Sequence, residues 1–405
     1  MTQGEAEVTR REFIRMTGAA ALTAALPASG EEAAWGGWQK GHFQVHLING
    51  HGEQMLWIMP DGTSMLLDCV GGIVPRYVKK ANPFGNAVDY MMASHYHPDH
   101  VGTPHKNNHS QKGRDCKYDY YRSGFGLAAE KLTFKKAIDR SWPTWEDPVP
   151  VLDWCEESRM HMEKVYKFIA ARDGTAIEKV RLGATDQIVP LKDPAACAGF
   201  SVRNVCANGR IAGADGKVID LYGDYIARKH PKGLNENAMS IGVVATYGAF
   251  RFYSAGDFSA SVPRADGSQV AIENEIAKAV GHCQVAKLNH HACKGNPAEF
   301  VRTVSAKVWL NVSLSPVHHL TPDVCERLAD RKLYPGERMI CPLFFPEKRR
   351  TEEADRPYMK DIAPASFGNG GHIVLDVPPG GRTFTVTYLS PDDKMTVRSV
   401  STFES

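Results

Sequence analysis

The chain lacks the features that mark several common classes of protein. No apolar run approaches the roughly 20 residues that a membrane-spanning helix needs. The formal net charge is only +2, so no strong overall field favours nucleic acid or anionic lipid. No glycine-rich phosphate loop, nucleophile-elbow serine or dinucleotide fingerprint precedes a helix in the required place. With 43% hydrophobic residues, the composition indicates an ordinary globular protein with ample material for a core.

Paired cysteine motifs are also lacking. The nine cysteines are scattered and no two form a Cys-x-x-Cys pair, which argues against a zinc ribbon or a dithiol redox site. In an exported chain, an odd number leaves at least one thiol unpaired. Which of the cysteines pair, if any, stays open: Cys69, Cys116, Cys155, Cys197, Cys206, Cys283, Cys293, Cys325 and Cys341.

The N-terminus has the pattern of an export signal. Arg10 and Arg11 are followed by Phe13 and Ile14, and then by a short apolar run that ends near Leu26. This order resembles the twin-arginine signal, which the twin-arginine export machinery uses to move folded proteins across a bacterial inner membrane. An amphipathic N-terminal helix is the alternative. We therefore expect residues 1–29 to be a signal peptide and residues 30–405 to be a periplasmic or secreted domain, without stable membrane insertion after cleavage.

Metal-binding residue types follow several predicted strands. Strand-like runs cover 42–50, 54–72 and 87–94, and others lie within 239–257, 283–290 and 306–312. The run 126–140 predicts a helix, 186–191 predicts a short strand, and 372–377 with 383–389 predict a hairpin that closes the chain. The ends of α/β strands are where loops converge and ligands gather. Five such residues or clusters occur in order along the chain: Asp68, the cluster at 95–100, Asp257, His290 and His319. The sequence predicts an α/β fold with a metal site at its strand ends.

The cluster His95-Tyr96-His97-Pro98-Asp99-His100 is the strongest signal. His95 and His97 are two apart on an extended segment, so both can face one ion at about 2.0–2.1 Å. Asp99 and His100 then turn away and can serve a second ion. Two such ions, about 3.5–4 Å apart, can activate a hydroxide and grip a phosphoryl or carbonyl oxygen.

This cluster resembles the signature of the metallo-β-lactamase superfamily, which implies a four-layer αβ/βα sandwich around a dinuclear metal site. The downstream order is similar to the hydrolase domain of ComEC-type DNA-uptake proteins and their soluble relatives. The matching positions are Asn237 and Ser240, Gly256 and Asp257, Lys287 with His290 and His291, and His319. The resemblance covers residues 42–103 and about 180–385.

Several departures from that family are visible. Ala292 and Cys293 stand where the family has Gly-Ser, and Leu320 stands where it has proline. The transmembrane channel is absent, so DNA transport is not implied. The superfamily's third metal histidine is replaced by the Asn237 region, with His230 as a weaker substitute. Residues 105–180 exceed the family core, and we expect them to form a helical insertion that shapes the substrate site.

The expected roles combine spacing and resemblance. The first ion takes His95 and His97, the second takes Asp99 and His100, and Asp257 bridges both. One of His290 and His291 completes the ligands of the second ion, with His290 slightly preferred, while the other makes a hydrogen bond next to those ligands. Further residues are expected around the ligands: His319 as a ligand or leaving-group contact, Asp68 as the residue orienting a ligand histidine, Asn237 near the site, and Lys287 as a neutraliser of substrate anions.

These roles predict a metal-dependent hydrolase. The expected cofactors are two divalent ions, with zinc first and manganese as the alternative. A metal-activated hydroxide would attack the substrate, with Asp99 as the catalytic hydrogen-bond acceptor. The expected substrate is a small molecule, nucleotide or other phosphodiester. An acyl hydrolase acting on a β-lactam, lactone or thioester is the second reading, and a non-catalytic metal-binding protein is the third.

Overall fold

The computed structural model describes residues 33–102, 119–143, 155–221, 223, 235–259, 261–263, 269–312 and 319–405. The predicted signal peptide at 1–29 and His230 lie outside these residues. So do 105–118 and 144–154 of the predicted insertion. Within the described residues, no helix is both long and apolar enough to span a membrane.

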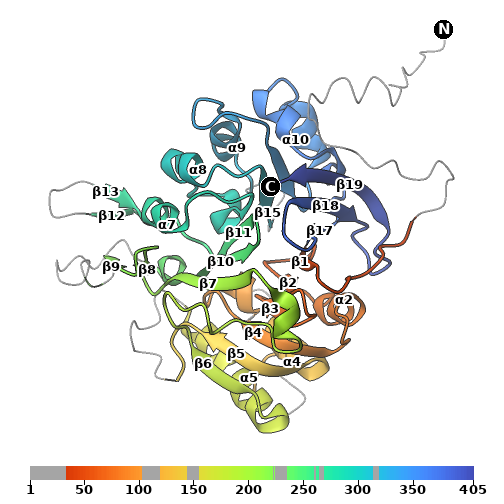
Figure 1. Cartoon of the computed structure of the whole chain (residues 1–405), viewed down its shortest axis with the longest axis vertical. Helices are drawn as coiled ribbons and strands as arrows, with labels where there is room; N and C mark the ends of the chain where they lie inside the picture. Colours follow the sequence, from red (N-terminus) through yellow and green to blue (C-terminus); the bar gives the residue numbers. More distant parts are fainter. Residues whose placement is uncertain are drawn as a thin grey trace.

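Two mixed β-sheets form the centre of the molecule (Figure 1). The larger has nine strands, parallel from β3 to β6 and antiparallel elsewhere. In spatial order they are β19 (Val397–Glu404), β18 (Thr383–Leu389), β17 (His372–Val377), β1 (Phe43–Leu47), β2 (Met55–Ile58), β3 (Ser64–Leu67), β4 (Ala87–Met92), β5 (Thr133–Asp139) and β6 (Ala176–Lys179).

The second sheet has eight strands, and β11, β14, β15 and β16 run parallel in it. In spatial order they are β16 (Met339–Pro342), β15 (Val308–Asn311), β14 (Val285–Lys287), β11 (Phe250–Ala255), β10 (Gly242–Tyr247), β7 (Phe200–Ala207), β8 (Arg210–Ala212) and β9 (Val218–Asp220). A separate hairpin joins β12 (Ser261–Pro263) to β13 (Gln269–Ala271).

Eight α-helices lie in the described part of the chain, together with short 3-10 turns. They are α2 (Val74–Ala81), α3 (Pro98–Val101), α4 (Gly124–Lys131), α5 (Glu156–Asp173), α7 (Ile272–Val280), α8 (Ala298–Val304), α9 (Pro322–Ala329) and α10 (Glu347–Glu352). Two 3-10 turns matter below: η2 (Glu236–Met239) and η3 (Asn289–Ala292).

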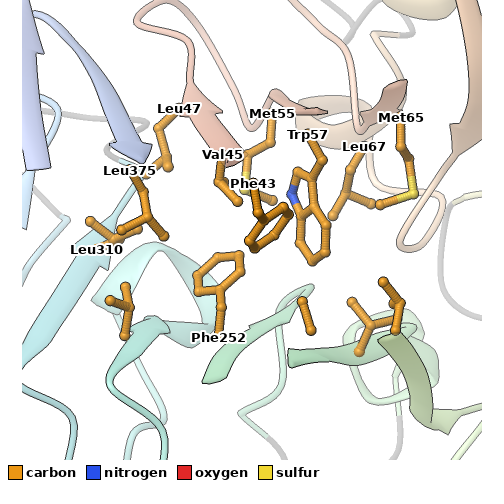
Figure 2. Close-up of a cluster of buried hydrophobic side chains, with 14 of the residues drawn as sticks. Phe43, Val45, Leu47, Met55, Trp57, Met65, Leu67, Phe252, Leu310 and Leu375 are labelled. Carbon is orange, nitrogen blue, oxygen red and sulfur yellow. The ribbon is translucent and has the colours of Figure 1, made fainter. Parts of the chain in front are cut away.

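The sheets pack face to face because their strands alternate. In β1, Phe43, Val45 and Leu47 enter the core between the sheets, while the intervening polar residues face the other way. Figure 2 shows Trp57 of the nine-stranded sheet opposite Phe252 of the eight-stranded sheet, with ring centroids 5.3 Å apart. The two sheets therefore share one apolar core.

Helices cover the outer face of each sheet. Residues of α2, α4 and α5 pack against the nine-stranded sheet in one buried cluster. Residues of α7, α8 and α9 pack against the eight-stranded sheet in another. The observed architecture is an α/β protein with two mixed sheets flanked by helices, as the sequence predicted at that level.

Three local expectations were wrong. The run 126–140 reads as helix, but only α4 is helical and β5 follows it, with Phe134, Ala137 and Ile138 buried in the sheet. Residues 186–191 form no strand, and β19 adds a strand after the predicted closing hairpin. Because β5 pairs with β4 and β6 pairs with β5, the described part of 105–180 supplies sheet strands as well as helices.

Candidate metal centre

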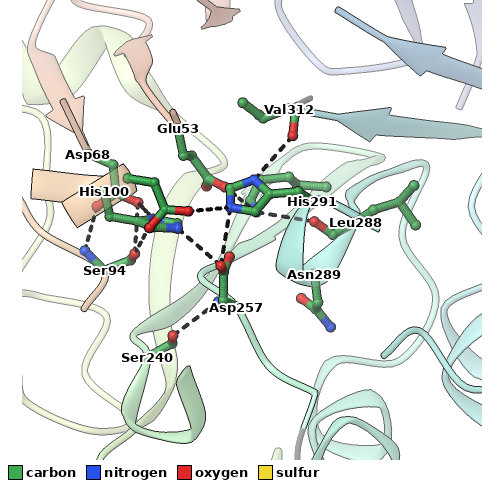
Figure 3. A network of polar contacts seen from close by, with 12 residues as sticks. Glu53, Asp68, Ser94, His100, Ser240, Asp257, Leu288, Asn289, His291 and Val312 are labelled. Atoms are coloured by element: carbon green, nitrogen blue, oxygen red, sulfur yellow. Dashed lines mark hydrogen bonds and ion pairs between the residues drawn. The ribbon is translucent and has the colours of Figure 1, made fainter. Parts of the chain in front are cut away.

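Four ligand-type side chains meet where strands of both sheets end. Glu53, His100, Asp257 and His291 each place one ligand atom within 4.8 Å of all the others. Figure 3 shows these side chains pointing toward one another. All four are buried. We call these four residues the inner group.

The inner group comes from four separate connections. Glu53 lies between β1 and β2, and His100 lies in α3 after β4. Asp257 follows β11, and His291 lies in η3 after β14. The first two connections are joined directly, because the Glu53 amide donates to the Asp99 carbonyl at 2.8 Å. The tertiary fold therefore assembles the group from positions far apart in the sequence.

His100 is held by a carboxylate on each side. Its Nδ1 lies 2.8 Å from Asp68 Oδ2, and its Nε2 faces Asp257 Oδ2 at 3.2 Å. Burial alone would lower the pKa of His100, but Asp257 and Asp68 outweigh it and raise the pKa well above the usual value. Without a metal, the imidazole is therefore protonated, and an ion would have to displace that proton.

His291 has a similar arrangement. Its Nδ1 lies 3.1 Å from the Val312 carbonyl, which leaves Nε2 facing Asp257 Oδ2 at 3.2 Å and Asp99 Oδ2 at 3.4 Å. Burial opposes its protonation, but Asp257 and Asp99 raise the pKa of His291 to about 10. Of the histidine pair, the structure thus brings His291 into the inner group rather than the slightly preferred His290.

An unusual backbone turn presents the histidine pair. His290, His291 and Ala292 have φ values of 48°, 50° and 57°, in the left-handed region that L-residues rarely adopt. The side chain of Asn296 braces the turn by hydrogen bonds to Asn289 N and O at 3.0 Å each. Glu273 in turn accepts the Asn296 amide at 2.6 Å. Surrounding contacts therefore hold a backbone that Ala292 would not adopt alone.

His95 and His97 lie beside the inner group. Their ring centroids are 4.8 Å apart, and the His95 ring is 4.1 Å from that of His100. Ser94 Oγ approaches His95 Nδ1 at 3.1 Å, and His95 is fully buried. Burial, with His100 and His97 nearby, lowers the pKa of His95 well below its usual value. A neutral imidazole is the form that binds a metal.

Asp257 is positioned by tight packing of its neighbours. Its amide donates to Ser240 Oγ at 3.1 Å. A Cβ on Gly256 would lie 2.5 Å from Ser240 Oγ and 2.9 Å from Ser94 Oγ, so only glycine fits there. Burial would raise the pKa of Asp257, but His100 and His291 lower it strongly. The carboxylate is therefore ionised.

The other predicted residues lie around this centre. His290 is half-buried, with Nδ1 2.8 Å from Ser259 Oγ. The His319 ring stacks on that of His291 at 5.0 Å. Asn237 is buried in η2, and its Oδ1 makes no hydrogen bond within the described residues. All three border the centre without entering the inner group.

Lys287 contacts the inner group. Its side chain is fully buried, and Nζ bonds to Glu53 Oε2 at 2.9 Å and to the Leu288 carbonyl at 3.1 Å. These contacts place the ammonium beside an acid of the centre itself. The expected neutralisation of a substrate anion by Lys287 stays a prediction.

Glu53 is the one inner-group residue that sequence reasoning missed. It lies in Gly-His-Gly-Glu before β2, where one histidine accompanies it but no larger cluster of ligand types does. The only signal was physical: an acid flanked by apolar strands needs a buried cationic partner. That partner, Lys287, lies 234 positions away in the sequence.

Several buried atoms of the centre make no hydrogen bond within the described chain and fit a cation. In the part of the chain that the structure describes, five buried ligand-type atoms make no hydrogen bond: Glu53 Oε1, His95 Nε2, His100 Nε2, Asp257 Oδ1 and His291 Nε2. Buried polar atoms are rarely left unsatisfied, and an ion is a standard reason. Mixed imidazole and carboxylate ligands suit zinc and similar divalent ions.

No model of a known protein family matches the chain. A search of curated proteins likewise finds no significant match.

Proposed function

We propose that this chain is a metal-dependent hydrolase with a metallo-β-lactamase-type sandwich and two divalent ions, zinc or manganese. One observation carries the proposal. The imidazoles of His95, His100 and His291 each have Nδ1 near a neighbouring protein oxygen and a buried Nε2 without a hydrogen bond in the described region. Ligand histidines are characteristically anchored in this way.

The protein groups divide into metal-holding and supporting roles. His95 and His97 would hold one ion, His100 and His291 the other, and Asp257 would contact both. Bound divalent ions would supply a hydroxide near neutral pH and polarise a phosphoryl or carbonyl oxygen. The Asp99 side chain is 29% exposed, compared with 2% for Asp257. Asp99 therefore stands where substrate would arrive, and its carboxylate can accept a hydrogen bond from the nucleophile.

A phosphodiester is the proposed substrate class. The support is the motif order that resembles the ComEC-type hydrolase domain, with Asn237 and Ser240 beside the centre and Ser240 bonded to the Asp257 amide. Export through the twin-arginine machinery to the periplasm or beyond belongs to the same proposal. Acyl hydrolysis and metal binding without catalysis are the competing outcomes of its test.

The experiment measures metal content and hydrolysis by the purified full-length chain. Bis(p-nitrophenyl) phosphate and a chromogenic β-lactam are offered in parallel to wild type and His97→Ala. His282→Ala serves as control, since His282 bonds to Ser305 outside the centre at 2.8 Å. We expect about two ions per chain, with metal-dependent phosphodiester cleavage that only His97→Ala loses.

Other results would overturn parts of this proposal. Cleavage of the lactam alone would establish the acyl-hydrolase reading instead. Two bound ions without either activity would contradict catalysis on both substrate classes. A chain that takes up no zinc or manganese would refute the metal centre itself.

A further inference from the structure

The candidate ligands differ sharply in burial. Glu53 and His100 are 0% exposed, and Asp257 and His291 are 1% exposed. By contrast, His97 and Asp99 both reach the surface in part. The centre therefore has an enclosed side and an accessible side.

We propose that its two metal positions have different roles: an inner ion held by Glu53, His100, Asp257 and His291 ties the two sheets together, while an outer ion at His95 and His97 performs the chemistry. This inference rests on the proposed function and adds Glu53 as a metal ligand. The inner ion would stabilise the fold, and the outer ion would serve the reaction.

The first argument is that the inner group forms a complete set of ligands. Two imidazole nitrogens and two carboxylate oxygens lie within 4.8 Å of one another. Four protein ligands are what a tetrahedral structural zinc site uses, whereas catalytic sites keep one position open for water or substrate. With all four side chains buried, the inner position is closed by protein.

The second argument comes from Lys287. It bonds to Glu53 Oε2 at 2.9 Å and thereby fixes the carboxylate, while Oε1 stays buried without a hydrogen bond in the described residues. Lys287 also balances one of the two carboxylate charges of the inner group. A divalent ion would satisfy Oε1 and replace the positive charge that the ligand imidazoles lose when they release their protons.

The third argument is topological. Glu53 and His100 belong to connections of the nine-stranded sheet, while Asp257 and His291 follow β11 and β14 of the eight-stranded sheet. An ion that binds all four would therefore cross-link the two sheets at the ends of interior strands. Its removal should loosen the packing between them.

The fourth argument separates the outer position. Asp257 Oδ2 is the atom that faces both His100 and His291, at 3.2 Å each, whereas Oδ1 makes no hydrogen bond in the described part. Oδ1 is therefore free for a second ion. Beside it, His95 and His97 supply two nitrogens on the side where His97 and Asp99 are accessible, so positions for water and substrate remain there.

The experiment removes metal stepwise from the zinc-loaded full-length chain with increasing chelator. Metal retained per chain, the thermal midpoint and phosphodiester cleavage are followed together. We expect two steps. Loss of the first ion abolishes cleavage with little change in midpoint, and loss of the second lowers the midpoint by at least about 5 °C.

Variants assign each step to its ligands. Glu53→Gln should lose the tightly held inner ion and with it the second step of metal removal. His97→Ala should lose only the outer ion and the first step. Glu53→Gln/Lys287→Met removes both charges, so that no buried charge is left alone if the single variant folds poorly. Glu178→Gln, at a partly exposed acid paired with Lys136, is the control and should keep both ions.

Retained metal and midpoint decide the inference even without a cleaved substrate. Simultaneous loss of both ions, or a Glu53→Gln chain that keeps both with an unchanged midpoint, would overturn it while leaving the proposed hydrolase intact. Wild type that binds no metal would instead refute the proposed function.

Discussion

At the scale of single residues, Asp68 organises the ligands of the centre. Its carboxylate accepts the Ser94 amide and hydroxyl at 2.7 Å each and contacts His100 Nδ1 at 2.8 Å. It does so from a left-handed backbone conformation, with φ 54°. One side chain thus orients His100 and, through Ser94, the start of the histidine cluster. A carboxylate behind a ligand histidine also makes that histidine a stronger ligand.

Asp68→Asn should weaken metal binding about 10- to 100-fold, because the neutral amide no longer orients and polarises His100. Competition with a chromophoric chelator measures the affinity. Asp376→Asn is the matched control, since Asp376 makes the same contact, at 2.8 Å, with His42 away from the centre. Equal affinities for wild type and Asp68→Asn would show that His100 needs no such support.

At the scale of elements, a buried ion pair supports the loop that carries the histidine cluster. Arg140, just after β5, bonds in a bidentate way to Glu236 of η2 at 2.9 and 2.8 Å, and neither side chain is exposed. Glu236 Oε1 also accepts the amide of Tyr96 at 3.3 Å. Because Tyr96 lies between His95 and His97, this pair couples strand β5 and turn η2 to the ligand loop.

Breaking the pair should destabilise the fold more than removing it. Arg140→Met should lower the free energy of unfolding by about 3–5 kcal/mol, because the buried Glu236 carboxylate loses the guanidinium that balances its charge. Arg140→Met/Glu236→Leu should recover much of that loss. Urea denaturation measures both, and Asp186→Asn is the control because its ion pair with Arg181 is exposed. A double variant no more stable than the single one would contradict this account.

At the scale of the whole molecule, buried neutral histidines away from the centre set the acid limit of stability. Burial lowers the pKa of His46 and His161 to about 3 and that of His372 to about 4. All three are neutral in the folded chain near pH 7, but the unfolded chain protonates them near their ordinary value. Their contribution is therefore present above about pH 6.5 and is lost as the pH falls.

Stability should decline steadily from pH 6.5 toward pH 4. Each of these histidines contributes up to about 1.4 kcal/mol per pH unit in that range. In the metal-free chain, the raised pKa of His291 acts oppositely: its contribution is complete below pH 6.5 and fades as the pH rises toward 10. Urea midpoints measured between pH 4 and pH 10 test both trends, and His161→Gln should make the loss of stability below pH 6.5 less steep. An equally steep loss in His161→Gln would contradict the role given to this histidine.

The sequence by itself determined the α/β character, most of the strands and the histidine cluster. These are local features: alternation with a period of two marks β1, a continuous apolar run marks β2, and the cluster lies within six consecutive residues. Strand β5 was misread because "AAEKLTFKKAID" contains strong helix formers, and only pairing with β4 makes its second half a strand.

The tertiary structure alone decided which distant side chains meet. It paired Lys287 with Glu53, brought Glu53 to the inner group and placed His291 rather than His290 beside Asp257. The left-handed turn at His290–Ala292 governs where each histidine points, and contacts from Asn296 and Glu273 hold that turn. Spacing along a chain fixes neighbours within one element, whereas the packing of two sheets brings together charges separated by hundreds of residues.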